Sequence, residues 1–460
     1  MHCDFAGYRG IEHGLAMMEK QMKQHGLAEG WLQEWRTTEI NKHCLQLMKD
    51  SWRPPHHCFP GLNCLQTEEA AQAIASFRPS KDEASKENKL LAYERMKQWM
   101  DDNPKSFSPR RLGRKCQNHP GNFCPVSFDA KSPDAPWANN MARRPICVNS
   151  SSPMCLPWCD FGGKQGEAHP SMESWYLYTH DIQGGDYDLA FIENSSNMPI
   201  PAWKGSLNRN MSPKYITVGS EDLGKPAPRF RLAGVGVNEE ELFWAGPSGD
   251  DMTADFLRFF GAACRLKQTS TPALTALRRK SVSFDTWRTF VKLPPPMDHQ
   301  DLLSDSGKKF LGEAKQITAT GRRVGPMGTS VCDVSQDPTV AQRLSPWMPT
   351  LMKSSEIVLI RNGNKPCTHI FTPSELAFSQ GWPTVKAAPK RFRDCMMFDM
   401  GGLSNNNKKI MLGNGIHLFP ITAWHFYVFS HVVRKDVIAK LHMPLATCLE
   451  VIALPDSDSD

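Results

Sequence analysis

Two side chains in the middle of the sequence could make and break a covalent bond to a substrate. Cys155 lies in SPMCLPWCDFGGKQG, after an apolar run typical of a strand, and Glu193 ends the next such run, in DYDLAFIENS. A thiol can attack an electron-poor ring carbon, and a carboxyl group can donate a proton or a hydrogen bond to a ring nitrogen. The pair therefore indicates attack on an activated heterocycle.

Cys155 and Cys159 together also fit half of a zinc site or a short disulfide. A zinc site needs a second pair with matching spacing, and the candidates Cys58/Cys64 and Cys116/Cys124 are spaced too widely. Fourteen cysteines in 460 residues are too few for a disulfide scaffold, so we expect reduced thiols. We interpret Cys155 as a nucleophile, with Gly162, Gly163 and Gly166 letting its loop close over a substrate.

Cys116 and Cys124, with His119 between them, could also supply zinc ligands. No further ligand at matching spacing is evident in the sequence, so we favour two ordinary surface thiols over a zinc site. We therefore predict no bound metal.

The elements around Cys155 and Glu193 predict an α/β sheet. DFAGYRGIEHGLAMMEKQM reads as the end of a short strand, a glycine turn and an amphipathic helix, and LQEWRTTEINKHCLQLM reads as a strand followed by a second helix. PICVNSS and DYDLAFIENSS predict two more strands that end in polar residues. Active sites of open α/β sheets lie at such strand ends.

Composition restricts the class of protein. Apolar residues make up 40% and charged residues 22% of the chain, as in globular proteins, and the most apolar stretch contains His417, His425 and His431, so we predict no membrane segment. The net charge is +6, with basic clusters in RRLGRK, ALRRK and GKKF/GRRV. Such clusters suit a phosphate backbone, although each alone could simply be a solvated surface.

The patterns divide the chain into three parts. Residues 1–245 form the first part of a catalytic domain with an insertion at about 66–142, in which SKENKLLAYERMKQWMDD predicts a helix that buries one face. Residues 246–370 have little periodicity and predict a smaller, irregular β-rich domain. Residues 371–460 return to the catalytic domain and end in DSDSD, which we expect to be disordered.

Several motifs, in order along the chain, resemble the carbon-5 cytosine-specific DNA methyltransferases that use S-adenosylmethionine. DFAGYRGIEHGL resembles the opening glycine motif, SPMCLPWCDFGG the loop of the nucleophilic cysteine, FIENS the E-N-V motif and LGKPAPRFRLAGVGV the Q-x-R-x-R motif. FTPSELAFSQGWP resembles a later helix motif, in which Thr372, Pro373 and Glu375 predict a capping box. KKIMLGNGIHLFP resembles the last motif.

The resemblance implies a Rossmann-like methyltransferase sheet with helices on both faces and a small target-recognition domain at 246–370. It implies Cys155 as nucleophile, Glu193 as the carboxyl at ring nitrogen 3, and Arg231 and Arg229 at the base carbonyl and a nearby phosphate. It also implies S-adenosylmethionine as cofactor. The residues matched to the cofactor site are Phe5, Ala6, Gly7, Gly10, Glu39 (at the ribose), Ile40, Leu62, Pro153 and Asn414.

The implied reaction transfers a methyl group to carbon 5 of a cytosine that is flipped out of duplex DNA. The implied partner is duplex DNA, the implied location is intracellular (nuclear in a eukaryote), and the sequence names no protein partner. Two alternatives stay open: methylation of RNA, and a catalytically silent nucleic-acid-binding relative. Substitutions at Arg9, Gly61 and Leu156 favour the silent relative, whereas retention of the four implied catalytic residues favours activity.

Overall fold

The computed structural model describes most of the chain. The described residues are 1–4, 10–24, 26, 33–49, 55–80, 82, 85–107, 113–126, 144–159, 163–223, 229–261, 300–319, 329–336, 348–352, 354–362, 366–382, 402–415 and 417–440. The basic clusters at 277–280 and 321–323, the turn at 5–9 and the acidic tip lie outside them.

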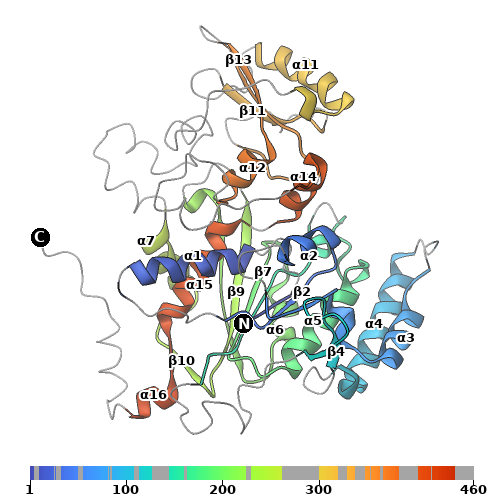
Figure 1. The fold of residues 1–460 in the computed structure, drawn as a ribbon, viewed down its shortest axis with the longest axis vertical. Helices are drawn as coiled ribbons and strands as arrows, with labels where there is room; N and C mark the ends of the chain where they lie inside the picture. The colour runs from blue at the N-terminus through green and yellow to red at the C-terminus, as the bar shows by residue number, and fades with distance from the viewer. Residues whose placement is uncertain are drawn as a thin grey trace, which may run out of the picture.

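A seven-stranded sheet forms the centre of the molecule, in the order β3-β2-β1-β6-β7-β9-β8 (Figure 1). Its strands are β1 (His2–Asp4), β2 (Arg36–Thr38), β3 (His57–Phe59), β6 (Val148–Ser151), β7 (Leu189–Ser195), β8 (Met211–Gly219) and β9 (Phe230–Asn238). Neighbours from β3 to β7 pair in parallel, and β9 is antiparallel to both β7 and β8. This is the predicted Rossmann-like methyltransferase sheet.

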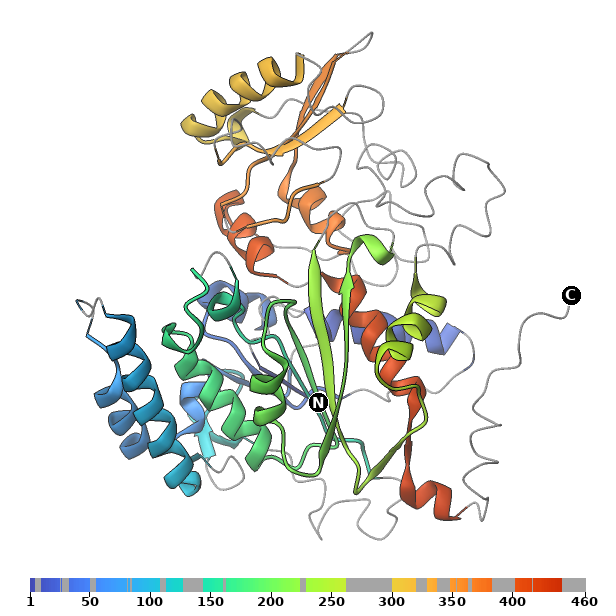
Figure 2. The same cartoon turned by 180° about the vertical axis from the view of Figure 1, so that it is seen from behind.

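Helices cover both faces of this sheet, seen from the opposite side in Figure 2. One face packs against α1 (Gly10–Gln24), α2 (Lys42–Lys49), α7 (Asp250–Phe260) and α15 (Leu418–His431). On the other face lie α5 (Met172–Gly184) and α6 (Ile200–Ser206), while α4 (Lys86–Asp102) packs on the outer side of α5 and α3 (Glu68–Phe77) packs against α4. Along β7, Leu189 and Phe191 enter the first core while Ala190 and Ile192 enter the second, as a strand buried on both faces requires.

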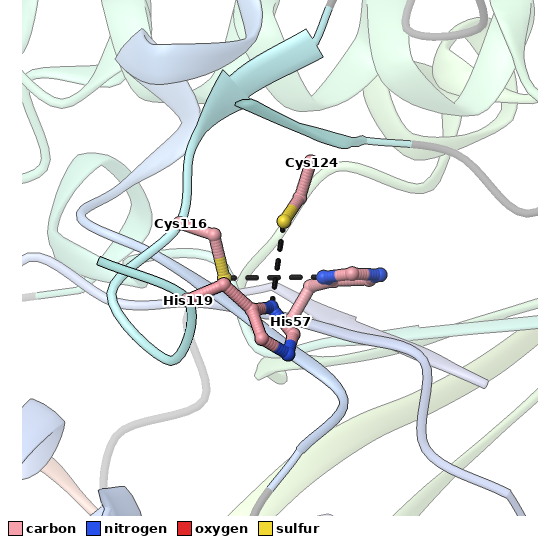
Figure 3. Close-up of side chains that lie close together, drawn as sticks. All are labelled: His57, Cys116, His119 and Cys124. Atoms are coloured by element: carbon pink, nitrogen blue, oxygen red, sulfur yellow. Dashed lines mark hydrogen bonds between the residues drawn. The ribbon is translucent and has the colours of Figure 1, made fainter. Parts of the chain in front are cut away.

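The insertion at about 66–142 contains α3, α4 and a hairpin of β4 (Gly113–Lys115) and β5 (Phe123–Pro125). On α4, Tyr93, Met96 and Met100 are buried, which confirms the predicted packing face. The hairpin lies beside the edge strand β3, where Gln117 N donates to Cys58 O at 2.9 Å. Figure 3 shows the side chains that meet at this junction.

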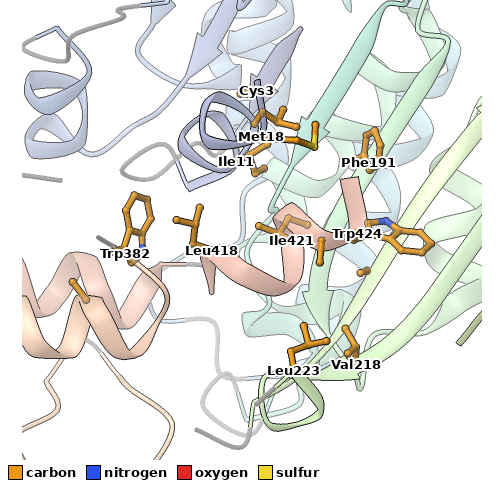
Figure 4. Packing of buried hydrophobic residues seen from close by; sticks show 14 of the residues in the cluster. Cys3, Ile11, Met18, Phe191, Val218, Leu223, Trp382, Leu418, Ile421 and Trp424 are labelled. Atoms are coloured by element: carbon orange, nitrogen blue, oxygen red, sulfur yellow. The ribbon is translucent and has the colours of Figure 1, made fainter. Parts of the chain in front are cut away.

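The last long helix, α15, is apolar all round because it is buried in the first core (Figure 4). Leu418, Ile421 and Trp424 pack with residues of α1 and with Phe191. His425 is accommodated there because its ring stacks on Phe191 at 4.0 Å and its Nε2 lies 2.8 Å from Ser150 Oγ. Burial lowers the pKa of His425 to about 4, so the ring is neutral. Among the described residues, no helix has both the length and the apolar character to cross a bilayer.

A smaller lobe lies beyond the central sheet. It contains α11 (Asp305–Ala319) and an antiparallel sheet of β11 (Thr329–Asp333), β12 (Ile357–Arg361) and β13 (Cys367–Ile370), which share a separate core. This agrees with the predicted small β-rich domain as a fold class. The division into 1–245, 246–370 and 371–460 stays a prediction, and α7 packs Met252 and Phe256 into the main core.

The chain returns through α12 (Pro373–Ser379) and α14 (Asn405–Asn414) before α15. The capping box predicted at the start of α12 is confirmed: Thr372 Oγ1 accepts from Glu375 N at 3.3 Å, and Thr372 N donates to Glu375 Oε2 at 3.0 Å. The chain then continues into β14 (Val432–Arg434), which pairs with β10 (Leu242–Trp244), and α16 (Lys435–Lys440).

A buried charge cluster joins three parts of the main body. The Arg36 guanidinium on β2 contacts Asp4 on β1 at 2.8 Å and Asp181 on α5 at 2.7 Å, and all three side chains are at most 2% exposed. Asn149 Nδ2 donates to Asp4 Oδ2 at 2.8 Å. Burial raises the pKa of Asp4, and the Arg36 charge opposes that rise. The cluster is thus stable only while the guanidinium stays between the two carboxyl groups.

The change Arg36→Met leaves two buried carboxyl groups without their cation, which we expect to lower the free energy of unfolding by about 3–5 kcal/mol. The matched control is Arg78→Met, because Arg78 pairs with Glu173 at 2.7 Å but is 49% exposed. Its loss is expected to cost at most about 1 kcal/mol. Urea denaturation measures both variants, and equal losses would contradict the structural role of the buried cluster.

Candidate active site

Cys155 and Glu193 belong to one edge of the central sheet. The carboxyl ends of the parallel strands β1, β2, β3, β6 and β7 meet there. The amino end of β9 joins them because β9 runs antiparallel to β7. The chain order reverses between β1 and β6, and ligands of open α/β sheets bind at such a switch point.

Cys155 lies on a loop that begins directly after β6. Its carbonyl accepts from Trp158 N at 3.0 Å and from Cys159 N at 3.1 Å, which closes a short 3-10 turn at Leu156–Trp158. The thiol is partly exposed. Gly163 and Gly166 have φ angles of 66° and 60°, in the region that favours glycine, and Gly162 lies outside the described residues. Glycine thus shapes the return of this loop, as predicted.

Glu193, near the end of β7, is held by a cation and by a hydroxyl group. Arg231 Nε lies 2.8 Å from Glu193 Oε1, and Ser152 Oγ donates to Glu193 Oε2 at 2.5 Å. In the β7–β9 ladder, Arg231 is opposite Ser195 and Ala233 is opposite Glu193, so the Glu193 and Arg231 side chains share one face of the sheet. Strand register therefore creates this ion pair.

The charges of this pair act on the Cys155 thiol. Burial raises the pKa of Cys155, the Arg231 guanidinium opposes that rise, and the Glu193 carboxylate adds to it. Arg229 also opposes the rise, more weakly. The structure thus brings together the predicted nucleophile, carboxyl and arginines. Their catalytic roles stay predictions at this point.

The two predicted arginines differ in their surroundings. Arg231 keeps 19% of its side chain exposed next to Glu193. Arg229 is 8% exposed, and its guanidinium donates to Gly415 O at 3.0 Å, in the segment after α14. The Arg231 side chain is therefore accessible to solvent, whereas Arg229 ties the segment after α14 to the start of β9. The predicted phosphate contact of Arg229 stays a prediction.

Two of the predicted cofactor residues, Glu39 and Ile40, directly follow β2 at the same edge. Glu39 follows β2, is 8% exposed, and accepts from Asn41 N at 2.8 Å through Oε1. Ile40 is 79% exposed. Gly61 has a φ of 95°, and a Cβ added at this glycine would lie 3.8 Å from Ile40 Cβ. A carboxylate beside an uncovered apolar side chain fits the ribose hydroxyls and the adenine ring of S-adenosylmethionine.

The remaining predicted cofactor residues are placed as follows. Gly10 begins α1, Pro153 follows β6, and Leu62 is 4% exposed in the second core. Asn414 is the last residue of α14, and nothing is described of its side chain. Phe5, Ala6 and Gly7 lie outside the described residues. Contacts between these residues and a cofactor stay predictions.

Three contacts of the site were not predicted from the sequence. Ser152 holds Glu193, Asn194 Nδ2 donates to Pro153 O at 3.1 Å, and the Gly415 carbonyl holds Arg229. Each joins segments that are far apart in the chain. Serine directly after an apolar run is the one cue that could have indicated Ser152.

The strand order and the helices on both faces are those of the predicted Rossmann-like methyltransferase fold. No family model and no curated protein matches the sequence. The structure is similar to Dnmt2 methyltransferase of S. pombe (10% identity, TM-score 0.48, covering 96% of this chain and 99% of that chain). It is also similar to the Entamoeba histolytica methyltransferase EhMeth (12%, 0.45, 93% and 97%).

A third similar structure is an E. coli protein described as a DNA modification methyltransferase encoded within a prophage (13% identity, TM-score 0.40, covering 94% of this chain and 99% of that chain). These similarities describe only the path of the chain in space. Any inference about substrate and activity rests on the residues of the site.

The surroundings of Cys155 predict a pH dependence. Its pKa is raised, so alkylation by iodoacetamide, which needs the thiolate, is expected to speed up with pH and to be half-maximal above the ordinary thiol range. Arg231→Ala removes the cation that opposes the rise, which moves the midpoint to still higher pH. Cys155→Ser defines the background from other thiols. An alkylation midpoint that is unchanged or lower in Arg231→Ala would contradict the described effect of Arg231 on the thiol.

Proposed function

We propose that this protein transfers a methyl group from S-adenosylmethionine to carbon 5 of cytosine in DNA. One observation carries the proposal: at the carboxyl edge of the sheet, the charges of the Glu193–Arg231 pair act on the pKa of the Cys155 thiol. A catalytically silent module needs no thiol beside such a pair. Their convergence therefore favours an enzyme over a binding protein.

Cys155 is the nucleophile in this proposal. Its sulfur, as thiolate, forms a bond to carbon 6 of the cytosine ring, and the electron pair of the carbon 5–carbon 6 double bond moves toward carbon 5. Because burial raises the pKa of the thiol, its proton must be removed before attack. The Arg231 and Arg229 charges favour the thiolate and so assist this step.

Glu193 and Arg231 then act on the polar edge of the base. A carboxyl group must carry a proton to donate to ring nitrogen 3, whereas a carboxylate paired with arginine only accepts. When the base enters, its carbonyl oxygen competes for the Arg231 donors, which frees the Glu193 carboxyl group to face ring nitrogen 3. The hydrogen bond from Ser152 Oγ keeps Glu193 Oε2 in position during this exchange.

S-adenosylmethionine, when bound, supplies the electrophilic methyl group that carbon 5 accepts. Glu39 and Ile40 would hold its ribose and adenine at the neighbouring strand ends. Loss of the carbon 5 proton to a water molecule then restores the ring double bond, ring nitrogen 3 returns its proton to Glu193, and the sulfur of Cys155 leaves carbon 6 as a thiolate. The protein residues end the cycle as they began it.

The substrate class follows from where the reacting groups lie. Cys155 and Glu193 are partly or largely buried, so a base must leave its stack to reach them. Met154, which precedes Cys155 in the chain, exposes 48% of an apolar side chain, which suits contact with an unstacked base. We propose duplex DNA as the partner, inside the cell.

The experiment is covalent trapping. Duplex DNA that contains 5-fluorocytosine is incubated with protein and S-adenosylmethionine, and the adduct persists because fluorine cannot leave carbon 5 as a cation. We expect an adduct that resists denaturant. It should be absent in Cys155→Ser, retained in the matched control Cys159→Ser, and formed at least about 100-fold more slowly in Glu193→Gln.

The same assay is run with a folded RNA that contains 5-fluorocytidine. An adduct with RNA alone would contradict DNA as the substrate while supporting the mechanism. Salt-sensitive binding of either nucleic acid without any adduct would contradict the enzyme and support a silent module. Trapping that survives Cys155→Ser but is lost in Cys159→Ser would reassign the nucleophile.

A further inference from the structure

Four side chains with metal-binding atoms meet at the junction of the insertion with the central sheet (Figure 3). His57 is the first residue of β3, and Cys116, His119 and Cys124 come from the β4–β5 hairpin. One ligand atom from each side chain lies within 4.8 Å of the other three. His57, Cys116 and Cys124 are buried, and His119 is partly buried.

The separations between the ligand atoms suit a tetrahedral ion. Cys116 Sγ lies 3.9 Å from His57 Nδ1, and Cys124 Sγ lies 3.4 Å from His119 Nδ1. Zinc binds sulfur at about 2.3 Å and nitrogen at about 2.0 Å, which separates ligands in a tetrahedron by about 3.3–3.8 Å. Small side-chain adjustments would therefore bring all four ligands onto one ion.

The hairpin backbone is shaped to present its three ligands. Asn122 N donates to His119 O at 3.0 Å, and Gly121, with φ 85°, makes the turn between β4 and β5. These contacts fold the C-x-x-H-x-x-x-x-C segment so that both thiols and the imidazole face one point. The loop is therefore built around a common centre.

Surrounding groups orient the ligands from outside. Cys58 N lies 3.5 Å from Cys116 Sγ, a donor placed to stabilise a thiolate. His56 Nδ1 lies 3.0 Å from His57 Nε2, which leaves His57 Nδ1 directed at Cys116. Trp35 stacks on His56 at 4.8 Å and fixes that ring. A hydrogen-bond partner on the outer ring nitrogen is typical of metal-binding histidines.

We propose that His57, Cys116, His119 and Cys124 bind one zinc ion that fastens the insertion to the edge of the central sheet. Two thiolates and two imidazoles are the ligand set that zinc prefers, and two thiolates balance its charge. Four protein ligands leave no open position, so the ion has a structural role. His57 lies at the amino end of β3, whereas Cys155 lies at the carboxyl edge, so the site is separate from the proposed chemistry.

This proposal replaces the prediction of no metal made from the sequence. That prediction considered Cys116, His119 and Cys124 but found no fourth ligand, because His57 precedes Cys116 by 59 positions. The ion would also protect the edge strand β3, since the hairpin that it holds covers the open side of that strand.

The first test is metal analysis of the full chain purified without added zinc. We expect about one zinc per chain by mass spectrometry of the metal. The double change Cys116→Ser, Cys124→Ser should lower zinc content at least about tenfold, since it removes both thiolates. The matched control Cys58→Ala, a buried thiol in β3 outside the ligand set, should keep its zinc.

A second measurement uses the unchanged chain, in case the double variant does not fold. Zinc is removed with a chelator and replaced by cobalt, and we expect thiolate-to-cobalt charge-transfer bands together with the intense visible bands of tetrahedral cobalt. Protein without zinc that shows no such bands with cobalt would overturn the proposal. A disulfide between Cys116 and Cys124 after purification under reducing conditions would do so too.

Discussion

Strand β9 runs antiparallel to β7, and this direction places the amino end of β9 beside the carboxyl end of β7. The register then puts Arg231 on the same face as Glu193, and the two side chains meet at 2.8 Å. A slip of the register by one residue would turn Arg231 to the other face of the sheet. The candidate active site therefore depends on the pairing of two strands that are not consecutive in the chain.

The rest of the main body keeps these strands in position. The Arg36 cluster joins β1, β2 and α5, and α15 packs along the face of the sheet to which Glu193 belongs by the alternation along β7. His425 of α15 contacts Ser150 in β6, a few residues before Cys155. The Gly415 carbonyl fixes Arg229 at the start of β9. Segments from both ends of the chain thus stabilise one edge of the sheet.

Local features of this protein could be predicted from its sequence, and contacts between distant segments could not. The strand that ends near Glu193 begins with an apolar run, and the cap at Thr372 has a spacing that one helix turn dictates. The contact of Ser152 with Glu193 depends on which strands are neighbours. The same holds for His57, which meets the hairpin cysteines only because the hairpin folds back onto β3.

The most direct measurement is the identity of the methylated product. Duplex DNA and folded RNA are incubated separately with the protein and methyl-labelled S-adenosylmethionine, then digested to nucleosides and analysed by mass spectrometry. The account predicts labelled 5-methyldeoxycytidine from DNA, and none when Cys155 is serine. Label on another atom or base, or no transfer to either nucleic acid by the folded protein, would contradict it.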